Sequence, residues 1–416
     1  MATHTHQHGH PHSHSLDTHT HSHPRTLPSQ SSRNHVTDES LTSRRDFFRV
    51  LAGGALAGAS VLELAYHRAA WASAAAPGAT SNLFNLQKVS DGVFFAMAHP
   101  QAQVNCNAAI FVRSKDVVVV DAHSKPSAAS SLIAQIKRDV TTKPVRYIVN
   151  THFHWDHIQG NAAYRAGGQV DIIATAATKK LMQDLSLSRL KESLDKVPAQ
   201  IDVLRQRAAH STSAPEKAFC AGQIHQLEAY AAELKDFKLE LPTITFDDSY
   251  LLADPAFDLH LGFHGHAHTA GDVFVHAPQA RTLATGDASH CWLPFMHDSY
   301  PHQWPHTIDQ VTQMDFKYLI GGHGPLQSDR TVMTCQRNYI EELTARVEEA
   351  KKAGQPLDEM QKRITVASLK SMHSNAYEDF LNRTLAATNP HYGPMPPLQE
   401  GLNENIADVF KNLDWA

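Results

Sequence analysis

The sequence has few cysteines, no long basic segment and no apolar run of membrane length. Its four cysteines form no Cys-x-x-Cys pair, which leaves free thiols or one disulfide as the alternatives. The 37 lysines and arginines form no basic block with interleaved aromatic residues, which argues against a nucleic-acid partner. No apolar stretch reaches the roughly 20 residues that a stable membrane span needs. A chain of 416 residues, 42% of them hydrophobic, can bury a full core, so a small-molecule substrate is the expected partner.

Residues 1–42 differ in composition from the rest of the chain. Histidine alternates here with threonine, serine and proline, as in THTHQHGHPHSHS near the start. Such a composition can chelate metal loosely but cannot pack a hydrophobic core, so we interpret 1–42 as a disordered leader. A metal-binding protein resting on this leader is the non-enzymatic alternative, and it fails if the mature chain lacks these residues.

Residues 43–76 resemble a twin-arginine signal peptide. Arg44 and Arg45 precede an apolar stretch at 50–62, and a small-residue cleavage pattern follows at 72–74. The resemblance implies the twin-arginine export machinery as a partner and a periplasmic or extracellular location. Proteins exported by this route are folded first, often with a metal already bound, so the signal suits a metalloprotein.

The body of the chain, from residue 83, alternates short apolar runs with helical patterns, which is typical of a mixed α/β fold. We expect a main domain over 83–330, a helical insertion at about 177–240 and a helical extension at 331–416. No internal repeat of fixed period is present. The expected strands lie within 92–99, 107–113, 116–123, 145–154, 259–278, 281–288 and 316–325, and a helix is expected over 127–140.

The run NTHFHWDHIQGN, at 150–161, carries three histidines and an aspartate within six residues. His152 and His154 are two apart, so on an extended strand end both side chains point to the same side and can bind one ion. Asp156 and His157 follow where the chain is expected to turn into a helix, which would aim them at a second ion. The run therefore predicts two half-sites supplied by one loop.

Further candidate ligands follow other predicted strands. His268 lies in AHTAGD, Asp287 in ATGDAS and His323 in GGHGP, while Asp121 closes the strand VVVVD. In their order and sequence contexts these motifs resemble those of the metallo-β-lactamase fold superfamily over about 83–330. The resemblance implies the αββα four-layer sandwich of that family, an α/β fold.

The resemblance also implies a role for each residue. One metal would be held by His152, His154 and His268, a second by Asp156, His157 and His323, and Asp287 would bridge the two. Asp121 is similar to the family's structural aspartate, which braces the ligand loop without binding metal. His266 competes with His268 as a ligand, and we prefer His268 because the family's histidine directly precedes the threonine.

Two such ions predict metal-assisted hydrolysis, because they can share a bridging hydroxide and polarise a carbonyl oxygen. Mixed His and Asp ligands favour two Zn²⁺, with iron or manganese also accepted. We therefore expect an exported hydrolase of a lactone, β-lactam or related ester or amide. Broad-spectrum β-lactamases lack the bridging aspartate that Asp287 would supply. A mononuclear iron dioxygenase acting on persulfides shares the fold and much of the ligand set, and stays open as the alternative.

Two residues are expected to take part in catalysis. Asp156 is one, as a metal ligand beside the attacking water. His290 is the other: it lies three residues after Asp287, where similar lactonases place a tyrosine that faces the substrate carbonyl. His290 could donate a hydrogen bond to the developing oxyanion or protonate the leaving group.

Overall fold

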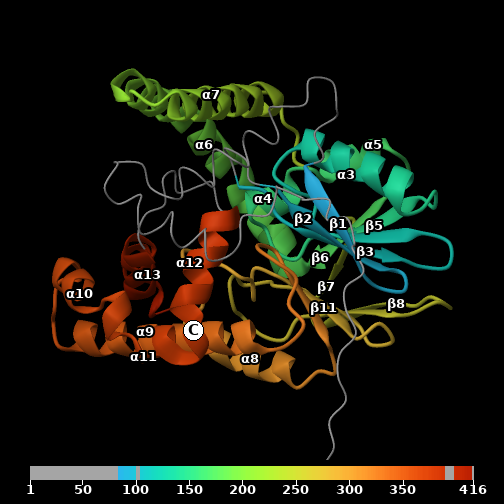
Figure 1. The fold of residues 1–416 in the computed structure, drawn as a ribbon. Helices are drawn as coiled ribbons and strands as arrows, with labels where there is room; N and C mark the ends of the chain where they lie inside the picture. The colour runs from blue at the N-terminus through green and yellow to red at the C-terminus, as the bar shows by residue number, and fades with distance from the viewer. Residues whose placement is uncertain (1–82, 100–103, 389–397, 415–416) are drawn as a thin grey trace, which may run out of the picture. The chain divides into compact units, whose positions relative to one another are not determined.

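The computed structural model describes residues 83–99, 104–388 and 398–414 and contains two β-sheets flanked by helices (Figure 1). The predicted leader at 1–42 and signal peptide at 43–76 lie outside these residues. Within the described part, no helix is long and apolar enough to cross a membrane. Cys106, Cys291 and Cys335 are buried free thiols.

The first sheet has seven strands in chain order. They are β1 (Phe84–Ser90), β2 (Val93–Ala98), β3 (Ala108–Val112), β4 (Val117–Val120), β5 (Val145–Val149), β6 (Asp171–Thr175) and β7 (Ile244–Phe246). The pairs from β1 to β4 are antiparallel, and those from β4 to β7 are parallel. The carboxyl ends of β4 to β7 therefore lie along one edge.

The second sheet has five strands in the order β12-β11-β10-β9-β8. They are β8 (Ser249–Leu252), β9 (Leu259–Gly262), β10 (Phe274–Ala277), β11 (Thr282–Gly286) and β12 (Tyr318–Gly321). Only the β11–β12 pair is parallel, so these two strands also end on the same side. The predicted strand region 259–278 is thus two strands joined by a loop that carries His268.

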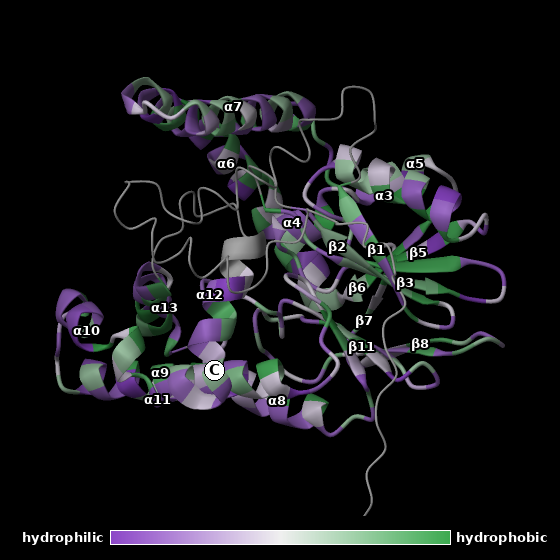
Figure 2. Ribbon diagram, in the orientation of Figure 1, coloured by the Kyte–Doolittle hydropathy of each residue, from purple (hydrophilic) through white to green (hydrophobic). Residues whose placement is uncertain are grey.

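The four valines of β4 explain how the sheets stack. Because side chains alternate across a strand, Val117 and Val119 pack under α3 (Pro126–Asp139) and α5 (Asn161–Ala166). Val118 and Val120 face the other way, into a core shared with the second sheet. All four are buried, as the unbroken apolar run predicts for a strand covered on both faces. Figure 2 shows hydrophobic residues gathered along the strands.

The outer face of the second sheet is covered by helices from the C-terminal part of the chain. Phe274 and Leu283 of the sheet share one hydrophobic cluster with Trp304 and Tyr339. The layers are therefore helix, sheet, sheet and helix, which confirms the predicted αββα sandwich. The helices are α8 (Trp304–Thr312), α9 (Thr331–Lys352), α10 (Leu357–Arg363), α11 (Lys370–His373), α12 (Tyr377–Thr388) and α13 (Leu398–Asn412).

Two long helices separate β6 from β7, at the place where the sequence predicts a helical insertion. They are α6 (Ala176–His210), whose N-cap is Thr175, and α7 (Ala214–Leu234), whose N-cap is Ser213. The two helices pack on each other through small apolar clusters, for example Leu190 with Tyr230. α6 starts directly after a strand whose end borders the histidine loop, so the insertion begins beside the candidate site (Figure 1).

The histidine loop starts earlier than the sequence pattern indicates. We expected the strand to run to His154, but β5 ends at Val149. After Asn150, the Thr151 N–H donates a hydrogen bond to the Asp121 carboxylate. The Thr151 carbonyl oxygen accepts one from Val273 N–H, in the loop before β10. A loop held between the two sheets therefore presents the histidines, and α4 (Trp155–Ile158) follows it.

Gly160 lets this loop pack against the end of β4. A Cβ atom on Gly160 would lie 1.8 Å from the carbonyl oxygen of Ala122 and 2.7 Å from the Cβ of Ala129. Since the first contact is backbone, it cannot be relieved by a side-chain rotation. The glycine after the cluster is thus required by close packing.

We expect Gly160→Ala to destabilise the fold by about 2 to 3 kcal/mol through this overlap. Gly222→Ala is the matched control, because Gly222 lies inside α7 with nothing within 4 Å of its built Cβ atom. That substitution should instead stabilise the protein by about 0.5 to 1 kcal/mol. Urea unfolding of both variants measures the difference, and equal stability of the two would contradict the packing argument.

Candidate metal centre

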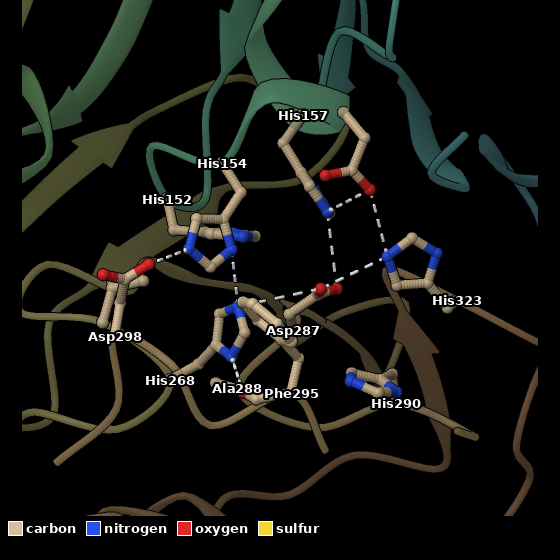
Figure 3. Close-up of polar contacts among 12 residues, drawn as sticks. His152, His154, His157, His268, Asp287, Ala288, His290, Phe295, Asp298 and His323 are labelled. Carbon is tan, nitrogen blue, oxygen red and sulfur yellow. Dashed lines mark hydrogen bonds and ion pairs between the residues drawn. The ribbon is translucent and has the colours of Figure 1, made fainter. Parts of the chain in front are cut away.

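The histidines and aspartates predicted as ligands gather in one buried cluster beyond the strand ends (Figure 3). His152, His154 and His268 form one group whose ligand atoms all lie within 4.8 Å of one another. Asp156, His157 and His323 form a second group on the same criterion, and a third joins His152 and His157 to Asp287. The structure thus brings together all seven residues, taken from four separate segments of the chain.

Hydrogen bonds fix which ring nitrogen of His152 faces the cluster. The Thr151 hydroxyl donates to the Asp121 carboxylate, so it can only accept from His152 Nδ1–H, at 3.0 Å. The proton of the neutral ring is therefore on Nδ1. His152 Nε2 is left with a bare lone pair and is buried without a hydrogen-bond partner.

The same reasoning gives an unusual pair at His154 and His268. His154 Nε2–H donates to Asp298 at 2.8 Å, and His268 Nδ1–H donates to the carbonyl oxygen of Phe295 at 3.0 Å. The opposite nitrogens, His154 Nδ1 and His268 Nε2, lie 2.9 Å apart (Figure 3). In neutral rings both nitrogens carry lone pairs, which repel one another unless a metal ion or a proton lies between them. The first group therefore fits a metal ion.

In the second group, His157 Nδ1–H donates to Asp121 at 2.8 Å, which leaves Nε2 facing the carboxylates of Asp156 and Asp287 at 3.4 and 3.5 Å. His323 Nε2 lies 3.2 Å from each of the same two carboxylates. The His323 ring is stacked on Trp292, with centroids 4.2 Å apart. Imidazole and carboxylate together suit zinc and related divalent ions.

Asp287 lies between the two groups. Its Oδ1 faces His157, and its Oδ2 faces His323 at 3.2 Å and His268 at 3.8 Å. This is the place that the family resemblance implies for a bridging ligand. His266, the competing candidate, is not part of any of these groups: its ring lies against Tyr300, with centroids 4.2 Å apart.

Asp121 braces both groups from behind. Its carboxylate accepts hydrogen bonds from the Thr151 backbone, the Thr151 hydroxyl and His157. The backbone of Asp121 has φ = 69°, a left-handed conformation that costs a non-glycine residue about 1 to 2 kcal/mol. The bonds that Asp121 makes offset this strain, and its contacts are those of a support for the ligands.

The burial and charge of the groups give them different protonation in the metal-free protein. Burial lowers the pKa of His152 and of His268 well below the ordinary range, so both rings are neutral. Burial also opposes charge on His323, but the carboxylates of Asp287 and Asp156 outweigh it and raise its pKa to about 9. A metal ion at the second group must therefore displace a proton at neutral pH.

One carboxylate at the site was not singled out from the sequence. Asp298 binds the non-ligand nitrogen of His154 and forms two hydrogen bonds with Arg189 of α6, at 2.7 and 2.8 Å. Although burial raises the pKa of Asp298, Arg189 and His154 hold it well below the ordinary range. Asp298 is the single acidic residue of the segment SHCWLPFMHDSY, which could have suggested it as a histidine partner.

A cavity of about 440 Å³ opens onto the cluster. The metal-facing residues at its base include Asp156, Asp287 and His323. One wall comes from a single face of α6, with residues three to four apart, and another from the loop after β11. The remaining lining residues are Val104, His154, Trp155, Arg189, Glu192, Ser193, Lys196, Gln200, His290, Trp292, Leu293, Phe295 and His297.

His290 also lines this cavity and is almost fully buried. Its Nδ1 accepts a hydrogen bond from the Trp292 backbone at 3.0 Å, so the proton of the neutral ring is on Nε2, which has no partner. Burial lowers the pKa of His290 to about 4. At neutral pH it is therefore a hydrogen-bond donor and not a charged acid.

The family model described as the metallo-beta-lactamase superfamily matches residues 102–323, which is just over half of the chain. The chain belongs to this superfamily. The matched region includes every residue of these groups, from His152 to His323, as well as Asp121.

Solved structures of the same superfamily are similar to this chain. A metallo-beta-lactamase from Pontibacter korlensis is 18% identical, with a TM-score of 0.46, over 62% of this chain and 99% of its own. The metallo-beta-lactamase FIM-1 from Pseudomonas aeruginosa, in its mono-zinc form, is 16% identical, with a TM-score of 0.44, over 62% and 95%. One from Hirschia baltica is 16% identical, with a TM-score of 0.44, over 62% and 97%.

We predict that the second metal ion is lost first as the pH falls. At pH values below the His323 pKa of about 9, a metal ion competes with a proton for His323. The metal affinity of the second group should therefore fall by about tenfold per pH unit for each proton displaced. The first ion meets the neutral rings of His152 and His268 and should stay bound. Equilibrium dialysis of the chain without its leader, at fixed free zinc from pH 8 to pH 6, measures the stoichiometry. Equal loss of both ions would contradict this assignment.

Proposed function

We propose that the chain is an exported binuclear zinc hydrolase acting on a lactone, a β-lactam or a related ester or amide. The observation that carries the proposal is the pair of buried His and Asp groups linked by Asp287 at the base of one cavity. A closed structural zinc site would need four ligands and no cavity, whereas four of these seven residues, His154, Asp156, Asp287 and His323, line a cavity with space for a substrate.

One zinc ion would be held by His152, His154 and His268. The other would be held by Asp156, His157 and His323, and Asp287 would bind both ions. When bound, two zinc ions supply a hydroxide nucleophile at neutral pH and an electrophile for the carbonyl oxygen. Asp156 orients the attacking water from the base of the cavity, through its carboxylate. His290 donates its Nε2–H to the oxygen that becomes negative during the attack.

The cavity wall supports a substrate with an apolar group beside the reacting carbonyl. Val104, Trp155, Leu293 and Phe295 all line it, and Phe295 is 45% exposed, which is high for a phenylalanine. An acyl chain or aromatic ring packed there would leave the carbonyl over the metal-facing residues. Export through the twin-arginine route belongs to the same proposal, and an exported protein that begins near Ala75 would support it.

Elemental analysis and a substrate panel test the proposed function. The chain purified without a tag and without its leader should hold two zinc ions and hydrolyse a member of a lactone, β-lactam and thioester panel. His323→Ala should lose mainly one ion with its circular dichroism unchanged, because the core strands do not depend on this side chain. One tightly bound iron ion, with oxidation of persulfides, would overturn the hydrolase in favour of the dioxygenase alternative.

His290→Phe is predicted to lower kcat by about 10² to 10³ on the substrate found by the panel, with KM little changed. Phenylalanine fills a similar volume but removes the Nε2–H donor. Since a pKa of about 4 leaves His290 neutral, its contribution should not change between pH 6 and pH 8. Steady-state kinetics at several pH values, on variant protein with both metals present, measure this. A kcat equal to that of the wild type would remove His290 from the reaction.

A further inference from the structure

Arg189 of the helical insertion is linked to the metal centre by hydrogen bonds. Its guanidinium makes two parallel hydrogen bonds to Asp298, from Nη1 at 2.7 Å and from Nη2 at 2.8 Å. Asp298 in turn accepts from His154 Nε2 at 2.8 Å. The chain of contacts thus runs from α6, through a carboxylate, to a histidine of the first group (Figure 3 shows the Asp298–His154 part).

A second contact ties Arg189 to the same loop. The guanidinium carbon lies 5.2 Å from the ring centroid of Phe153, the residue between His152 and His154 in the sequence. A guanidinium over an aromatic face is attractive, and more so when partly buried. Arg189 therefore holds the ligand loop at two points, Phe153 and His154.

This ion pair is much less exposed than the lysine–aspartate pairs on α6. The Asp298 side chain is 12% exposed and that of Arg189 is 35% exposed. By contrast, Lys191 and Asp195 form a pair on the same helix with 77% and 63% exposure. Exposed pairs of that kind contribute little, whereas a bidentate, partly buried pair has a fixed geometry.

We propose that Arg189 is a positioning residue, through which the docking of α6 over the cavity and metal binding at His154 are coupled. The inference rests on the proposed metal centre but not on the substrate or the reaction. Arg189 orients Asp298, and Asp298 keeps the His154 proton on Nε2, so that Nδ1 faces the metal. Metal binding then favours the docked position of α6 by the same free energy with which docking favours metal binding.

The coupling predicts a specific pattern of hydrogen exchange. In the wild type, zinc should slow exchange both in the ligand loop, at 150–158, and in α6 around Arg189. Arg189→Met should remove the zinc-dependent part of the protection in α6. It should also raise by about tenfold the free zinc concentration that half-protects the loop, since such outer partners contribute about 10- to 100-fold to metal affinity. A merely structural role would speed exchange in α6 equally with and without zinc.

Three variants complete the experiment, carried out on the full chain in zinc buffers with mass-spectrometric detection. Lys191→Met, which breaks the exposed pair on α6, should behave as the wild type. Arg189→Lys keeps the charge but not the two parallel bonds, and should restore part of the coupling. Asp298→Asn should uncouple α6 from zinc while Arg189 is still present.

The outcomes separate this inference from the proposed function. The inference is overturned if zinc still protects α6 in Arg189→Met and the free zinc concentration that half-protects the ligand loop is unchanged. If Arg189→Met unfolds α6 outright, Asp298→Asn decides, and wild-type behaviour of that variant overturns it equally. If zinc protected neither the ligand loop nor α6 in the wild type, both this inference and the proposed zinc centre would be overturned. Failure to find hydrolysis would overturn only the proposed reaction, because hydrogen exchange requires no substrate.

Discussion

The carboxylate of Asp121 controls both metal-facing groups at once. It accepts a hydrogen bond from the Thr151 hydroxyl, and that hydroxyl must therefore accept a hydrogen bond from His152 Nδ1–H. It also accepts a hydrogen bond directly from His157 Nδ1–H. One buried carboxylate thereby fixes the Nδ1 proton of two histidines and directs both Nε2 atoms into the cluster. Metal binding depends on ring nitrogens that are buried and aimed at one place, and its pH dependence follows from the carboxylates of Asp287 and Asp156, which raise the pKa of His323.

This arrangement has a cost that the fold has to offset. His154 Nδ1 and His268 Nε2 are held 2.9 Å apart, and Asp121 adopts a left-handed backbone. The loops are held in place by the two stacked sheets, through bonds such as Val273 N–H to the Thr151 carbonyl oxygen, and by the close packing at Gly160. Such strain is typical of functional sites, where the surrounding structure over-determines the conformation.

The helical insertion supplies none of the seven candidate metal ligands, whereas the loop after β11 supplies Asp287. They contribute most of the cavity wall, and Arg189 and Asp298 join them directly behind His154. The part of the chain that selects a substrate is therefore in contact with the part that binds metal. A substitution in the helical insertion can thus alter metal binding as well as substrate recognition, because the two parts are in direct contact.

The sequence, through its resemblance to the metallo-β-lactamase superfamily, was sufficient for the order of layers and for the seven candidate ligands. The apolar run of β4, the helical spacing of the insertion and the motifs HxHxDH, His268, Asp287 and His323 are local patterns, and each reflects a local requirement of burial or chemistry. Only the tertiary structure decided which atoms face one another. It placed the end of β5 at Val149, set the proton positions, left His266 outside the cluster and brought Asp298 to His154 across 144 positions of the chain. Hydrogen bonds between residues so far apart depend on how the two sheets stack, and no local pattern carries that information.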